Sequence, residues 1–160
     1  MKNLLISFFF CVAFGSIHAQ QYTYAIGVKG TYATTDIVGA DLSFKHFFQS
    51  PNAIEANIGF SRNYVWLQGL YMRSFPLKRD FEWYLGAGGD AGYWQRNYIQ
   101  QYNGRSFQGF WVGVDGVVGV EYTFTTFPIN ISVDAGPTLR MVPYVQLGVM
   151  AGLSCRFAIR

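Results

Sequence analysis

Apolar and polar residues alternate with a period of two along most of this chain, which predicts β-strands with one apolar and one polar face. The first alternating run extends from Tyr22 to Tyr32 and sets aromatic and branched residues against small or polar ones such as Lys29. A polar connection over residues 34–39 leads into a second run over 41–45. The two runs together predict an antiparallel hairpin.

Six further segments repeat this pattern, near residues 53–60, 64–72, 82–90, 111–122, 129–134 and 145–157. Alternation does not assign the faces of segment 64–72, because Gln68 and Arg73 fall on opposite parities. Compact turns with proline near 51, 76 and 128 alternate with connections near 36, 63, 100 and 139, of which only 95–106 is long. Eight strands of roughly 9 to 11 residues would use about 70 to 90 residues. We therefore predict an all-β fold, an eight-stranded antiparallel up-and-down barrel.

The first 19 residues have a different pattern, with a positive charge at Lys2, an apolar run over 4–14 and a small-residue exit that ends at Ala19. This arrangement is typical of a cleaved signal peptide. The apolar run is too short to be a membrane anchor, since a spanning helix needs roughly 20 apolar residues. We expect a signal peptide over 1–19 and one barrel domain over 20–160. Loss of Lys2 lowers the formal charge from +3 to +2.

Composition favours a barrel that lies in a membrane. Charged residues make up 13% of the chain and aromatic residues 19%, a balance that would solvate a soluble protein poorly. A transmembrane β-barrel instead uses aromatic residues as girdles at both membrane surfaces. We expect Tyr22, Trp83, Tyr122 and Phe157 at the periplasmic strand ends, and Tyr32, Tyr93 and Phe110 at the outer ends. A soluble lipocalin-like barrel that binds a ligand is the structural alternative.

Three stretches resemble the small OmpA/OmpX-like outer-membrane barrels of Gram-negative bacteria, namely Trp83–Trp94, Gly113–Tyr122 and the closing strand that ends in Arg156-Phe157. The resemblance covers essentially all of 20–160. It implies a multi-pass β-barrel of the outer membrane, transmembrane and part of the cell envelope, folded by the barrel assembly machinery. Such barrels often end on an aromatic residue that this machinery reads. Here residues 158–160 follow the aromatic one, so that signal is displaced.

The polar face of each strand would line the inside of such a barrel. Parity places ten charged residues there: Lys29, Asp41, Lys45, Glu55, Glu82, Asp90, Asp115, Glu121, Asp134 and Arg156. An eight-stranded barrel is just wide enough to be filled by its own side chains, so a general pore is not expected. We interpret the set as a bonded polar network that braces the lumen, because an unpaired buried charge is costly. The acidic excess leaves a cation or proton site as the sharper hypothesis.

The longest outer connection, 95–106, mixes amides, tyrosines and arginines. We regard Arg96, Tyr98, Tyr102 and Arg105 as a candidate binding surface. Such side chains suit a lipopolysaccharide phosphate, an extracellular glycan or a protein partner. The expected role is therefore structural or interactive at the cell surface, in contact with outer-membrane lipid and lipopolysaccharide.

Candidate catalytic and metal-binding residues are scarce. His46 is the only histidine after residue 19, and no nucleophile and base can be assembled around it at the outer rim. Cys155 is the only cysteine there, which gives no metal-ligand spacing and no internal disulfide. We expect no enzyme activity, no cofactor and, given the small scattered charge, no nucleic-acid partner. An outer-membrane lipid-modifying enzyme is the alternative of a different class.

Overall fold

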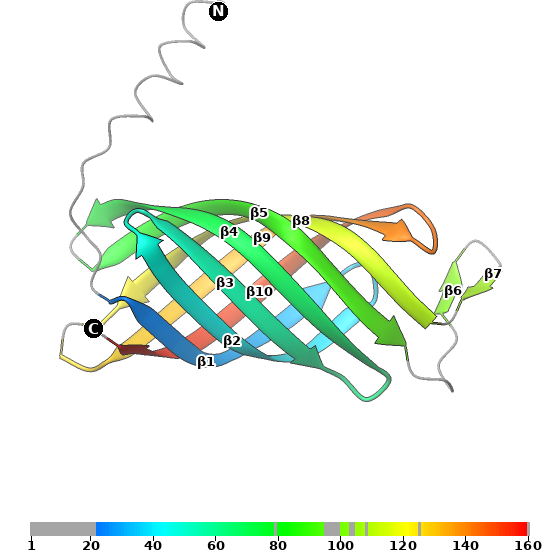
Figure 1. Ribbon diagram of the computed structural model, residues 1–160, viewed down its shortest axis with the longest axis horizontal. Coiled ribbons are helices and arrows are strands. Elements are labelled where there is room, and N and C mark those ends of the chain that lie inside the picture. The colour runs from blue at the N-terminus through cyan, green and yellow to red at the C-terminus, as the bar shows by residue number, and fades with distance from the viewer. Residues whose placement is uncertain are drawn as a thin grey trace, which may run out of the picture.

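The computed structural model describes residues 22–78, 80–94, 100–102, 105–107, 109–124 and 126–159. Eight long strands close into one antiparallel barrel (Figure 1): β1 Tyr24–Ala33, β2 Ile37–Gln49, β3 Asn52–Phe60, β4 Tyr64–Lys78, β5 Phe81–Trp94, β8 Gly109–Thr123, β9 Ile129–Val142 and β10 Gln146–Ile159. Two short strands, β6 Gln100–Tyr102 and β7 Arg105–Phe107, form a separate hairpin between β5 and β8. No helix in this part of the chain is long and apolar enough to cross a membrane.

The barrel closes because its first strand pairs with its last. β1 and β10 are antiparallel and in continuous register from Tyr24 opposite Ile159 to Ala33 opposite Met150. Every other long strand pairs with its neighbours in chain order, apart from the inserted hairpin. Closure leaves no free sheet edge, which hydrocarbon would not tolerate. The predicted eight-stranded up-and-down barrel is confirmed, whereas the signal peptide and its cleavage position lie outside the described residues.

Two strands, β4 and β9, continue through positions where the sequence pattern predicted a turn or connection. β4 runs on to Lys78, so the expected turn near residue 76 is part of the strand. β9 runs on to Val142, so the expected connection near 139 is wrong and the chain turns at 143–145 instead. Pro137 lies within β9 although proline cannot donate a ladder hydrogen bond. The proline is tolerated because β9 stays in continuous register with β10, where Pro137 stands opposite Val149.

The polarity of the barrel is inverted relative to a soluble protein. The side chains of Leu42 and Leu147 are 57% and 75% exposed on the outer surface, whereas Lys29 and Lys45 are almost completely buried inside. Water would not solvate such an outer surface, but a lipid bilayer would. This arrangement rules out the lipocalin-like alternative, in which the apolar face would point inward.

One expected girdle residue is placed differently. Tyr22 is only 4% exposed and lies inside the barrel, so its predicted girdle position is wrong. The chain bends at Thr23, just before β1 begins, and this bend breaks the alternation that puts Tyr24 on the outer face. The Tyr22 ring packs edge-on against Phe47 at a centroid separation of 5.2 Å. The other expected girdle residues are exposed or half-buried.

The faces of β4 are settled by the fold. Tyr64, Trp66 and Gln68 point into the lumen, and so do Leu70 and Met72 further along the strand. Neither face of this strand is mainly polar, which explains why alternation did not assign them. Gly59 on β3 makes room for the Trp66 ring, because a Cβ at Gly59 would lie 1.9 Å from Trp66 Cε2.

Candidate functional site

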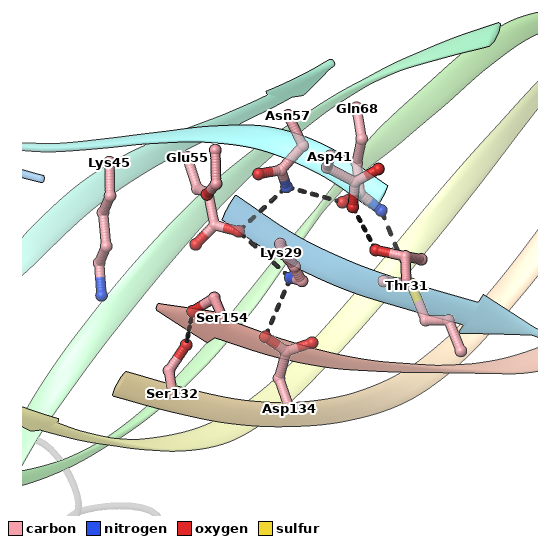
Figure 2. A network of polar contacts seen from close by, with 12 residues as sticks. Lys29, Thr31, Asp41, Lys45, Glu55, Asn57, Gln68, Ser132, Asp134 and Ser154 are labelled. Atoms are coloured by element: carbon pink, nitrogen blue, oxygen red, sulfur yellow. Dashed lines mark hydrogen bonds and ion pairs between the residues drawn. The ribbon is translucent and has the colours of Figure 1, made fainter. Parts of the chain in front are cut away.

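An ion-pair cluster occupies the centre of the lumen (Figure 2). Lys29 Nζ lies 2.9 Å from Asp134 Oδ2 and 3.2 Å from Glu55 Oε1. Arg156 Nη2 lies 2.7 Å from the other oxygen of Glu55. Inward positions of β1, β3, β9 and β10 therefore meet across the barrel at one level. All four side chains are buried, so the pairs are shielded from water.

A second cluster lies toward the end of the barrel where β1 begins. Lys45 Nζ is 2.7 Å from Glu121 Oε2, and it also lies over the rings of Phe47 and Tyr84 at 4.9 and 4.8 Å from their centroids. The Tyr22 hydroxyl donates a hydrogen bond of 3.2 Å to the same Glu121 oxygen. Burial, with the nearby Glu121 carboxylate, raises the pKa of Tyr22 well above its usual value, so the phenol stays a donor.

Glu82 joins this second cluster only in part. It lies directly opposite Glu121 in the register of β5 and β8, and its side chain is half-buried. Within the described residues no ion pair includes Glu82. It therefore stands at the margin of the buried network.

Amide and hydroxyl groups extend the network toward the opposite end. Asn57 Nδ2 donates 3.0 Å hydrogen bonds to Glu55 Oε1 and to Gln68 Oε1, and Gln68 Nε2 donates to Asp115 at 2.7 Å. The Thr31 hydroxyl donates to Asp41, as Figure 2 also shows. The bonds of Asn57 and Gln68 link the central ion pairs to Asp115, and both Asp115 and Asp41 are buried.

An arginine packed against a pair of tryptophans, Trp94 and Trp111, caps the lumen at that end. The Arg140 guanidinium carbon lies 5.0 Å from the ring centroid of Trp94 and 5.2 Å from that of Trp111. Trp111 Nε1 donates a 2.7 Å hydrogen bond to Asp90. Tyr64 packs on Trp111 from β4, with centroids 6.0 Å apart. All five side chains are buried, and together we call them the aromatic cap.

The structure thus brings nine of the ten predicted lumen residues into buried positions and leaves Glu82 half-buried. Sequence reasoning missed Arg140, Asn57 and Gln68. Arg140 shares the parity of Asp134 and would have been found if the strand had been continued past Pro137. With Arg140 included, seven acids face four bases in the lumen.

The predicted loop surface is described only in part. Arg96 and Tyr98 lie outside the described residues. Tyr102 and Arg105 stand opposite each other in the β6–β7 hairpin, which projects beyond the end of the barrel in Figure 1. That end also carries the aromatic cap, because β5 finishes and β8 begins there.

Among the described residues, the one histidine and the one cysteine lie on the outer surface of the barrel. His46 is on the outer surface, where its ring stacks on Tyr24 at 4.4 Å, and Cys155 is exposed on the apolar face. No three His, Cys, Asp or Glu residues among those described are grouped to hold a metal ion. A small cavity near Gln68 and Asp115 measures about 10 Å³, which is room for about one water molecule.

The comparisons with known proteins identify the fold. The structure superposes on the crystal structure of the N-terminal β-barrel domain of Pseudomonas aeruginosa OprF with a TM-score of 0.60 and 17% sequence identity, covering 86% of this chain and 98% of that one. It also matches Neisserial surface protein A, at a TM-score of 0.47 and 13% identity over 88% of this chain and 97% of that one. No protein-family model and no curated protein sequence matches the chain.

The sheet is closed and eight-stranded, its outer surface is apolar, and its fold is shared with the OprF barrel. These features define an outer-membrane β-barrel protein. This is the architecture of the small OmpA/OmpX-like barrels that the sequence resembles.

Proposed function

We propose that the protein is a closed, non-catalytic barrel whose role is structural or in surface interaction. The observation that carries this proposal is the polar network, which crosses the lumen from wall to wall. Lys29 alone links β1 to β3 and β9, and Arg156 links β10 to β3. Side chains in such positions brace the barrel from within and occupy the space that a solute would need.

Both ends of the lumen support a closed barrel. The aromatic cap fills one end, and Tyr22 with Phe47 fills the other. The cavity near Gln68 is too small for a hydrated ion. We therefore expect the mature protein to show no steady conductance in planar lipid bilayers. A steady cation-selective conductance would contradict this proposal and would favour the cation-site hypothesis drawn from the acidic excess.

Replacing Arg140 with Ala provides a positive comparison for that measurement. The substitution removes the group that packs against both Trp94 and Trp111 and leaves the central ion pairs intact. We expect intermittent conductance in this variant and none in wild type.

The surface-interaction part of the proposal rests on the long connection that contains the β6–β7 hairpin. The other connections at that end are short, near residues 34–36, 61–63 and 143–145. The tyrosines and arginines of 95–106 supply ring faces and charged donors for lipopolysaccharide phosphate, for a glycan or for a protein. This is the surface through which we infer contact with partners outside the cell.

The test is a double substitution, Arg96→Ala with Arg105→Ala, assayed for binding of purified lipopolysaccharide to the folded protein in detergent. Two charge-assisted contacts of about 1.5 to 3 kcal/mol each would be lost if both arginines bind phosphate. Arg62→Ala is the matched control, because Arg62 is an exposed cation in a short connection at the same end. Unchanged binding in the double variant would count against the loop as a lipopolysaccharide site.

The non-catalytic part of the proposal is supported by the position of His46, which stacks on Tyr24 outside the lumen and belongs to no described nucleophile and base pair. We expect no hydrolysis or acyl transfer when the folded protein is incubated with lipid A and phospholipid in detergent. A turnover that the His46→Ala variant abolishes would overturn this assignment and support a lipid-modifying enzyme.

A further inference from the structure

The outer surface of the β4–β5 hairpin carries cations near the end of the barrel where β1 begins and β10 ends (Figure 1). By the rule that the short turns of such barrels face the periplasm, this is the periplasmic end. Arg73 is exposed there, directly opposite Leu85, whose side chain is 44% exposed on the apolar surface. Arg73 takes part in no ion pair with the described residues. A membrane-facing arginine is tolerated only close to the interface.

A β-bulge places a second cation on the same face. Pro76 pairs with Glu82 and Lys78 pairs with Phe81, so Leu77 is the extra residue. Residues directly opposite each other point to the same side of a sheet. Phe81 is exposed on the outer surface, so the bulge turns Lys78 outward as well. Without the bulge, the Lys78 side chain would point into the lumen, as the even-numbered residues of β4 do.

An aromatic pair lies between the two cations. Phe75 and Trp83 are opposite each other, and their rings stack at 4.5 Å with an interplanar angle of 17°. The Arg73 guanidinium carbon lies 5.6 Å from the Phe75 centroid, a cation–π contact that holds the charge at the surface. Arg73 stands opposite Leu85 and Lys78 opposite Phe81, so the two cations are attached about 13 Å apart along the sheet. Their long side chains can reach toward each other across this distance.

The charge of this surface is complementary to an anion. The acids on the described strands point into the lumen, so they do not offset the outward cations. Aromatic residues of a barrel girdle lie at the level of the lipid headgroups. The anion that fits this depth is a phosphodiester at the membrane surface.

We propose that Arg73, Lys78 and the Phe75–Trp83 pair form a binding site for the headgroup phosphate of an anionic phospholipid in the periplasmic leaflet. The guanidinium and the ammonium group donate charge-assisted hydrogen bonds to the phosphate oxygens. The stacked rings support the glycerol and the first methylenes of the lipid.

Native mass spectrometry of the mature protein tests the site. The protein is released from detergent that contains equimolar palmitoyl-oleoyl phosphatidylglycerol and phosphatidylcholine, and the ratio of the two retained lipids is measured. A basic residue near an anionic membrane surface contributes about 1 kcal/mol, which corresponds to about a fivefold change in the ratio. We expect wild type to retain mainly phosphatidylglycerol, and Arg73→Gln and Lys78→Gln each to lower the ratio about fivefold.

Arg62→Gln is the matched control, since it removes an exposed cation at the opposite end of the barrel. Its ratio should equal that of wild type. An unchanged ratio in the Arg73→Gln and Lys78→Gln double variant would overturn the proposal, and so would an equal fall in Arg62→Gln, which would indicate general charge attraction. A heat-dependent gel shift checks that each variant is folded. Lys78→Gln, at the very end of β4, remains the test if Arg73→Gln does not fold.

Discussion

Glu55 is the residue whose replacement tests the lumen network most directly. Its carboxylate lies 2.7 Å from Arg156, 3.2 Å from Lys29 and 3.0 Å from the Asn57 amide, and it is 1% exposed. Glu55→Gln keeps the shape of the side chain and removes its charge. Lys29 still has Asp134 as a partner, but Arg156 is left with no acid in ion-pair distance among the described residues.

The expected cost follows from that uncompensated arginine. Breaking a buried ion pair by removing one partner costs about 3 to 5 kcal/mol. We expect Glu55→Gln to lower the free energy of unfolding by about this amount, measured by urea titration of the protein in lipid vesicles with tryptophan fluorescence and linear extrapolation. Arg156→Met combined with Glu55→Gln should cost less than the sum of the single variants, by about 0.5 to 3 kcal/mol, because the two residues share one interaction.

Glu82→Gln is the matched control. It makes the same carboxyl-to-amide replacement at an inward position, but Glu82 is half-buried, is in no ion pair within the described residues and faces Glu121. We expect a change of about 1 kcal/mol or less. If Glu55→Gln costs no more than Glu82→Gln, the network does not stabilise the barrel, and the physical basis of the proposed function fails.

Three further outcomes are expected. The folded mature protein should migrate differently on a gel when boiled and unboiled, and the absence of a shift would argue against a detergent-resistant closed barrel. Leu42→Arg, on the lipid face at the middle of β2, should impair insertion into membranes, since a basic residue at the bilayer midplane costs about 2 to 4 kcal/mol; normal assembly would show that the assigned facing is wrong. Gly59→Ala should prevent stable folding because its Cβ would collide with Trp66, whereas Gly69→Ala, with open space around its Cβ, should be neutral in the same gel assay.

The fold was largely predictable because two-residue alternation reports directly on strands with two different environments. It placed Lys29, Glu55 and Asp134 on inward faces from parity alone, and the structure buries all three. Alternation was uninformative for β4, where Trp66 and Leu70 point inward and Leu67 points outward, so that both faces are apolar.

The errors came at the ends of strands, where alternation along the chain does not show how far a strand extends. The strand predicted over 129–134 was ended too early, with a connection near 139, and Arg140 was therefore missed although β9 continues to Val142. Tyr22 was assigned to the girdle by extending the parity of β1, but the bend at Thr23 turns its ring into the lumen.

The sequence by itself determined that charged residues would share one surface and apolar residues the other, because side chains on a strand point alternately to opposite faces. Only the tertiary structure decided which charges meet. Lys29 and Asp134 are 105 residues apart in the chain and form a 2.9 Å hydrogen bond. Their contact depends on closure of the barrel and on the stagger of its strands, which set the level at which each inward residue reaches across the lumen. Periodicity along one strand carries no information about that level.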